Sequence, residues 1–297
     1  MNSLAPVQTD HSTSPMYWSI QRELWENRSI YLAPLAVAAF VLLGSFIAIV
    51  GLPRRIQKLP PNDPVKQHSV IVTPFSMAPA PIMFTTLIVG IFYSLDALHG
   101  ERRDRSILFW KSLPVSDRTT VLSKASIPLL VLPLISLVLG IFMQWLLMLL
   151  GTAIFSANGI SPAALWREFR VFQEPVIMIY GIAVHILWFA PIYSWLLLIS
   201  AWARRTPILW ATLPPLAVGV LEKMAFNTTD FAHMLQYRAI GAMTEAFAGG
   251  QKHEIIDELG QLTPGRFLSA PGLWIGLIAA AAFLAVAIRL RRRREPN

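Results

Sequence analysis

The chain has 297 residues, of which 55% are hydrophobic and only 14% are charged. Soluble domains carry about 25% charged residues, and here the charges gather in short blocks between long charge-free runs. This pattern excludes a soluble globular protein and predicts a membrane protein, because about 20 apolar helical residues cross a bilayer. The runs lack the two-residue alternation of barrel strands, so we expect an all-α fold in one transmembrane domain, residues 1–297.

The residues before the first long run predict a helix that lies in the membrane interface. Ser14 and Pro15 form a good helix start, with a capping hydroxyl followed by proline at the first helical position. Tyr17, Trp18 and Trp25 then recur at helical spacing, with charged residues on the other faces. The alternative is a lead-in turn of the first span.

Six runs are long and apolar enough to be membrane-spanning helices. The fifth reaches full length only if it continues through Glu222 and Lys223. The expected spans are Tyr31–Leu52, Met77–Leu95, Ala125–Phe155, Pro175–Ala203, Thr206–Phe226 and Phe267–Ile288.

The distribution of Lys and Arg predicts that both termini are cytoplasmic. These residues are about twice as dense in the segments that this orientation places inside as in the others. The net charge of +8 therefore indicates orientation and contact with the anionic lipid bilayer, and no nucleic-acid partner is expected.

Two outer segments separate these spans. The segment 53–76 contains five prolines, which predicts an extended surface loop without a regular helix. In the segment 227–266, apolar residues recur at helical spacing in two stretches, around Phe231–Met243 and Ile255–Leu262. Short helices that cap the outer face before the last span are expected there.

The inner loop between the second and third spans combines a charged half with an apolar half. Its charged half ends near Arg105, and Leu108, Phe109 and Trp110 follow, so a helix here is expected to hold its apolar half against the membrane or the bundle. Pro114 ends this helix, and Ser116 is placed to cap the next one.

The run Asp96–Arg102, followed by Lys111–Pro114 and Lys124, resembles the cytoplasmic loop of type-2 ABC transporter permeases. The stretches 190–198 and Leu213–Pro215 are similar to a bacterial branch of that family. The resemblance extends over nearly the whole chain.

The resemblance implies a multi-pass permease subunit of an ATP-driven ABC exporter in the bacterial cytoplasmic (inner) membrane. It also implies two permease copies, as a homodimer or a related heterodimer, driven by separate ABC ATPase subunits. The loop would be the coupling helix that contacts the ATPase, through Glu101, Arg102, Arg103, Asp104, Arg105, Leu113 and Pro114. The alternative function is a non-transporting membrane scaffold or sensor partner with the same fold.

No enzyme activity is expected of this chain itself. The sequence has no Gly-x-x-x-x-Gly-Lys-Ser/Thr loop, which a phosphate-binding site of that type requires, so ATP hydrolysis is assigned to the partner. No cofactor and no metal site are expected. His253-Glu254 lacks the second histidine of a zinc motif, and an exposed helix is the favoured interpretation.

Four residues are candidates for a substrate path. His185 is an ionisable group inside the fourth span, which is a functional candidate by default, although a neutral histidine bonded to a neighbouring helix is the commoner case. Pro191 and Tyr193 lie in the stretch that resembles the family, and Glu222 either marks a route or simply ends the fifth span. Separately, Gly272-x-x-x-Gly276 predicts close helix packing.

Overall fold

The computed structural model describes residues 15–58, 60, 63–104, 115–248, 256 and 258–293. Within these residues six helical segments are long and apolar enough to cross a membrane, and the chain is an all-α membrane protein as predicted. In chain order the elements are α1 (Pro15–Glu26), α2 (Ser29–Val50), α3 (Leu52–Gln57), α4 (Pro64–Ser76), α5 (Pro79–Asp96), α6 (His99–Arg103), α8 (Asp117–Ser126), η1 (Ile127–Val131), α9 (Leu132–Ala157), α10 (Ala163–Glu168), α11 (Glu174–Trp202), α12 (Pro207–Phe226), α13 (Asp230–Ala246), η2 (Leu259–Gln261), α14 (Pro264–Ser269) and α15 (Pro271–Arg293).

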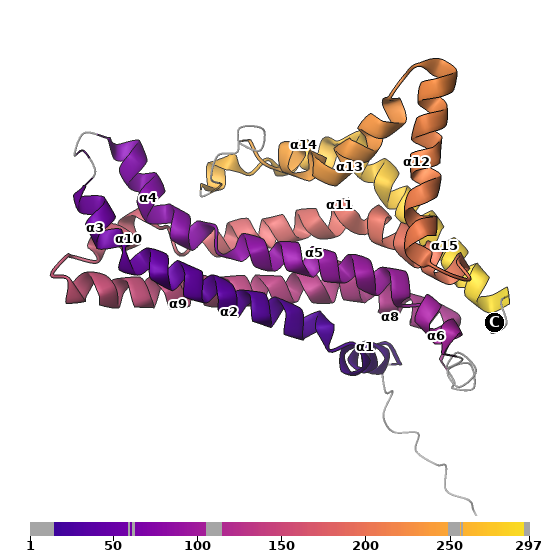
Figure 1. Ribbon diagram of the computed structural model, residues 1–297, viewed down its shortest axis with the longest axis horizontal. Helices are drawn as coiled ribbons and strands as arrows, with labels where there is room; N and C mark the ends of the chain where they lie inside the picture. Colours follow the sequence, from indigo (N-terminus) through magenta and orange to yellow (C-terminus); the bar gives the residue numbers. More distant parts are fainter. Residues whose placement is uncertain are drawn as a thin grey trace, which may run out of the picture.

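The spans form an elongated bundle with α11 at its centre. Helices α2, α5, α9 and α11 run side by side along its length, and α15 packs along α11 (Figure 1). Helices α1 and α6 and the last turns of α15 meet at one end, which we call the α6 end. Helices α3, α4 and α10 lie at the opposite end, which we call the α4 end. Helix α12 leaves the bundle at a steep angle, and only 6% of its most apolar 18-residue stretch is buried.

The third span is helical from Asp117 to Ala157 and contains one π-turn. Ser116 caps its start by accepting a hydrogen bond from the backbone N–H of Thr119 at 3.1 Å, which confirms the predicted cap. The π-turn η1 includes Pro128, which has no N–H to donate and so cannot complete the regular helical ladder. The turn therefore divides the span into a short α8 and a long α9.

The prediction of an extended loop at 53–76 is wrong, because Pro53 and Pro64 lie at the starts of helices and Pro74 lies within α4. Pro53 lies in the first turn of α3, and Pro64 is the first residue of α4. The first helical turn has free N–H groups in any case, so a proline there costs no hydrogen bond. The Asp63 carboxylate caps α4 by accepting from the N–H of Lys66 at 3.1 Å. Phe75 and Val72 of α4 are buried in the apolar core at the α4 end.

The first helix is separate from the first span, and its two faces differ in exposure. Asn27 and Arg28 divide α1 from α2, so α1 is not a lead-in turn. Tyr17, Trp18 and Trp25 are exposed, whereas Glu23 is buried against the bundle. An exposed row of aromatic rings is the side-chain pattern of an interfacial helix.

The segment before the last span contains α13, as expected, and the shorter η2 and α14. Of the second apolar stretch, residues 255 and 257 lie outside the described part, and the rest contributes only the turn η2. Gly272 and Gly276 do permit close packing. A Cβ on Gly272 would lie 2.7 Å from the Tyr237 ring, and a Cβ on Gly276 would overlap the Arg238 guanidinium. The two glycines thus leave room for the side chains of Tyr237 and Arg238 of α13.

Candidate coupling site at the α6 end

The short helix α6 is fixed to the end of α11 by its backbone. It follows α5 after a two-residue turn. The Ser200 hydroxyl accepts hydrogen bonds from the N–H groups of Leu98 and His99, both at 3.0 Å. Free N–H groups at a helix start need such an acceptor when they are buried. The His99 ring nitrogen Nδ1 lies 3.2 Å from the carbonyl oxygen of Ala203, so three contacts join the start of α6 to the end of α11.

Arg102 joins α6 to the same helix end by its side chain. Its guanidinium donates to the carbonyl oxygen of Ser200 and, at 2.8 Å, to that of Ala203. The last carbonyls of a helix have no partner within the helix and carry partial negative charge, which favours a cation there. Arg102 is only 4% exposed, and it therefore serves as a cationic cap for α11.

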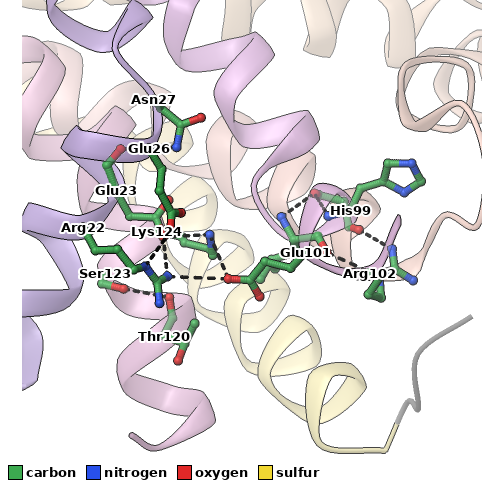
Figure 2. A network of polar contacts seen from close by, with 12 residues as sticks. Arg22, Glu23, Glu26, Asn27, His99, Glu101, Arg102, Thr120, Ser123 and Lys124 are labelled. Carbon is green, nitrogen blue, oxygen red and sulfur yellow. Dashed lines mark hydrogen bonds and ion pairs between the residues drawn. The ribbon is translucent and has the colours of Figure 1, made fainter. Parts of the chain in front are cut away.

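Glu101 points to the other side of α6, where it meets three cations from three helices. Its carboxylate accepts a hydrogen bond from Arg291 of α15. It also lies 3.2 Å from the Lys124 ammonium of α8 and 3.6 Å from the Arg22 guanidinium of α1. Figure 2 shows Glu101 and Lys124 pointing toward Arg22 and Glu23. A single carboxylate thus connects α6 to α1, α8 and α15.

Glu23 is the second centre of this cluster. It accepts from the Lys124 ammonium at 2.8 Å, from the Tyr93 hydroxyl at 2.7 Å and from the Arg22 guanidinium at 2.6 Å. On the far side, Arg291 also donates to Asp117 at 3.1 Å. We call these six charged residues the buried charge network, and its members are Arg22, Glu23, Glu101, Asp117, Lys124 and Arg291.

The network is electrically balanced, with three cations and three carboxylates. Burial by itself would raise the pKa of Glu23, but the Lys124 charge and the hydrogen bonds from Lys124, Tyr93 and Arg22 lower it below the ordinary value. Burial would likewise lower the pKa of Arg22, and the Glu23 carboxylate outweighs this and raises it. Both groups are therefore charged at neutral pH. Four members of the network are buried, namely Glu23, Glu101, Lys124 and Arg291. Removing a partner of one of these four leaves a buried charge uncompensated, which typically costs about 3–5 kcal/mol.

The residues predicted to contact an ATPase divide into two groups. Glu101 and Arg102, which the resemblance assigns to that contact, are buried by partners on other helices. The side chains of Arg103 and Asp104 are 60% exposed and form an ion pair at 3.0 Å. Arg105, Leu113 and Pro114, like the apolar half of the loop, lie outside the described residues. The described face available to a partner is therefore Arg103 and Asp104.

The candidate substrate-path residues fall at two separate places. His185 and Tyr193 of α11 are buried, with the His185 ring nitrogen Nε2 3.3 Å from the Tyr193 hydroxyl. Pro191 is buried in the same helix. Glu222 is instead exposed at the end of α12, where it accepts hydrogen bonds from the Thr228 hydroxyl and from two N–H groups at the start of α13. Glu222 is thus a helix cap, and the structure does not bring it to the other three.

Sequence reasoning missed most of the buried charge network. In the sequence, Arg22 and Glu23 are among the charged residues on the other faces of the first helix, and Arg291 is among the Lys and Arg residues that predict orientation. One signal was present, because Ser19 and Glu23 are one helical turn apart on the face opposite the aromatic rings. A carboxylate on the face that must meet the bundle requires a buried cation.

Comparison with known protein families, with curated proteins and with solved structures finds no match to this chain. Among the described residues no group of three or more His, Asp or Glu side chains is placed to hold a metal ion, and His253 and Glu254 lie outside them.

Proposed function

We propose that this chain is the transmembrane permease subunit of an ATP-driven ABC exporter, and that a separate cytoplasmic ATPase binds at the α6 end. In this proposal ATP hydrolysis belongs to the partner. The chain converts a push on α6 into rearrangement of its spans, and its two termini and the α6 end face the cytoplasm of a bacterial cell.

The observation that carries the proposal is the way α6 is held. One five-residue helix is joined by buried hydrogen bonds and ion pairs to the ends of α1, α8, α11 and α15, and it follows directly on α5. A force applied to its exposed face therefore reaches four of the six spans and the amphipathic helix. Coupling between distant sites requires such a contiguous set of packed and bonded groups.

The charge around the α6 end supports the proposed orientation. Exposed arginines surround it on the ends of four helices, whereas the exposed acidic residues there are few. Short segments rich in Lys and Arg remain on the cytoplasmic side during insertion. The exposed arginines are Arg103, Arg118, Arg204, Arg205, Arg289, Arg292 and Arg293.

The remaining proposed partners are the lipid bilayer and a second permease copy. Large apolar side chains are exposed along α2, α9, α12 and α15, and a surface of that extent is covered by lipid or by another membrane-spanning chain. The second copy follows from the resemblance, and chemical cross-linking in native membranes followed by sizing of the solubilised protein measures it.

The test is purification of the tagged chain from its native membrane, followed by identification of bound subunits by mass spectrometry. We expect an ABC ATPase, and ATP hydrolysis only when that subunit is present. ATP hydrolysis by the chain alone would overturn the assignment. Stable recovery of a partner that lacks an ATPase domain would instead favour the scaffold or sensor function.

A further inference from the structure

Arg291 differs from the other arginines at the end of α15. It is 6% exposed, whereas Arg289 and Arg292 are exposed. Its Nη1 donates to Glu101 of α6, and its Nε donates to Asp117 of α8. The guanidinium group holds its donors in a fixed planar fork, so one arginine can bind two carboxylates at once. Arg291 therefore joins the end of the last span to two other helices.

Two of the partners of Glu101 link α6 to different helices. Arg291 links α6 to α15, whereas Arg22 links α6 to α1. A further described contact between the α6 region and α15 is apolar, in a small cluster that includes Leu98 and Ala287. Apolar contacts are non-directional, so they hold the two segments together without fixing their relative rotation.

We propose that Arg291 is a positioning residue for α6. By holding Glu101 inward, it fixes the orientation of α6 relative to the last span, so that α6 and the end of α15 move as one body. The inference rests on the proposed function only for the source of the force, an ATPase bound to α6. The fixed orientation itself requires no partner.

The first test measures that orientation in the purified full chain without an ATPase. The chain has no cysteine, so nitroxide labels can be placed on single introduced cysteines and their distances measured by pulsed electron paramagnetic resonance. Labels at Arg103 and Arg292 report the α6–α15 distance, and labels at Arg103 and Tyr17 report the α6–α1 distance. All three positions are exposed.

The two distances give each variant its own internal control. Arg291→Gln should broaden the α6–α15 distance more than the α6–α1 distance, because Arg22 and Lys124 still hold Glu101, whereas Glu101→Gln should broaden both. Arg289→Gln removes the same charge from the same helix at an exposed position and should change neither. A native α6–α15 distribution in Arg291→Gln would overturn the proposal.

Arg291→Lys provides a second variant if Arg291→Gln does not insert. A lysine ammonium is a single point charge on a flexible stem, so it can reach Glu101 or Asp117 but does not hold both in a fixed geometry. We expect an α6–α15 distribution of intermediate width. A distribution as narrow as the native one would show that the two-carboxylate bridge does not set the orientation of α6, and would refute the proposal.

The second test uses the ATPase identified by co-purification. If α6 occupies the binding orientation in only one molecule in ten, the apparent dissociation constant rises about tenfold, because it scales inversely with the competent fraction. Arg291→Gln should therefore weaken ATPase binding, and Arg289→Gln should not. Absence of any ATPase would refute the proposed function and leave the distance result standing, whereas unchanged distances would refute the positioning role even if an ATPase binds.

Discussion

Glu23 shows how one residue determines where a whole helix lies. Its helix exposes aromatic rings on one side, and the carboxylate on the opposite side meets Lys124, Tyr93 and Arg22. Because a buried carboxylate is tolerated only with such partners, α1 has one rotation about its own axis that satisfies both faces.

Replacing Glu23 by glutamine should destabilise the chain strongly. The substitution keeps the shape but leaves the Lys124 ammonium without its closest carboxylate, and we expect a loss of about 3–5 kcal/mol in the free energy of unfolding. Denaturation of the detergent-solubilised protein measures this loss. Glu26→Gln is the matched control on the same helix. Glu26 is half exposed and lies 3.8 Å from Arg22, so a loss of about 0–1 kcal/mol is expected. Equal losses for the two variants would contradict the central role of Glu23.

Acid should release α1 from the bundle. The pKa of Glu23 is lowered in the folded chain, so the stability that this group contributes is fully present above the ordinary carboxyl value of 4.5 and is lost as the pH falls through the folded value. Hydrogen exchange of the α1 amides across that pH range reports the release. The Glu23→Gln variant should lose this pH dependence, and an unchanged profile in the variant would assign the transition to another group.

The inward orientation of Glu101 could not be predicted from its neighbours in the sequence. The local run of alternating charges is equally compatible with a solvated helix face, and the deciding partners Arg22, Lys124 and Arg291 lie in other helices. In the sequence, Arg22 is one of the charged residues on the first helix, and Arg291 is one of the arginines that predict orientation. Local spacing identifies a charged helix, but the side that becomes buried depends on counter-charges that approach only in the folded bundle.

At the scale of elements, α5, α11 and the π-turn η1 meet at Gly90. A Cβ there would lie 3.0 Å from a ring carbon of Tyr193 and 3.3 Å from Pro128. Both neighbours are buried and neither is the end of a flexible chain. This close approach places the π-turn η1 of the third span directly against α11.

Gly90→Ala should therefore be destabilising by about 1–3 kcal/mol, as overpacking of a well-filled core usually is. Gly44→Ala in α2 is the control, because nothing lies within 4 Å of a Cβ at that position. There alanine should be neutral or stabilise the helix by up to about 1 kcal/mol. Thermal unfolding of the two variants decides between these outcomes, and a neutral Gly90→Ala would show that the three segments can separate at little cost.

The exposed face of α6 should be the part of the element that an ATPase touches. Arg103→Ala should weaken ATPase binding about tenfold or more, since arginines are frequent among the few residues that dominate an interface. Membrane insertion should be unaffected. Arg54→Ala removes an exposed arginine at the α4 end and should leave binding unchanged. Equal binding by both variants would place the ATPase contact elsewhere.

The elements themselves were largely predictable, because a bilayer imposes a length and a composition on each span. All six spans agree with the hydropathy, and the Ser116 cap follows from one side chain. The helices at 52–57 and 64–76 were not predicted, because a high density of prolines favours a loop over a helix. At Pro53 and Pro64 proline occupies the first turn, where it is compatible with a helix, and only its position relative to the helix start distinguishes the two cases.

At the scale of the whole molecule, the orientation in the membrane is testable with single cysteines. In intact cells a cysteine at Lys66 or Asn158, both exposed and near the α4 end, should react with a membrane-impermeant thiol reagent. A cysteine at Arg103 should react only after the membrane is permeabilised. The opposite pattern would reverse the orientation inferred from Lys and Arg, and would place the α6 end out of reach of a cytoplasmic ATPase.

The buried charge network also imposes an order on biosynthesis. Glu101 and Arg291 are 190 positions apart in the chain, and Asp117 and Arg291 are 174 apart. At a translation rate of about 5–20 residues per second, Glu101 leaves the ribosome about 10–40 seconds before its counter-charge. During that interval the contact between Glu101 and Arg291 is missing, and a chain that stops short of residue 291 never forms it. Closure of the network thus requires nearly the whole chain. In a shorter chain Glu101 has only Arg22 and Lys124 as counter-charges, and Asp117 lacks the hydrogen bond from Arg291.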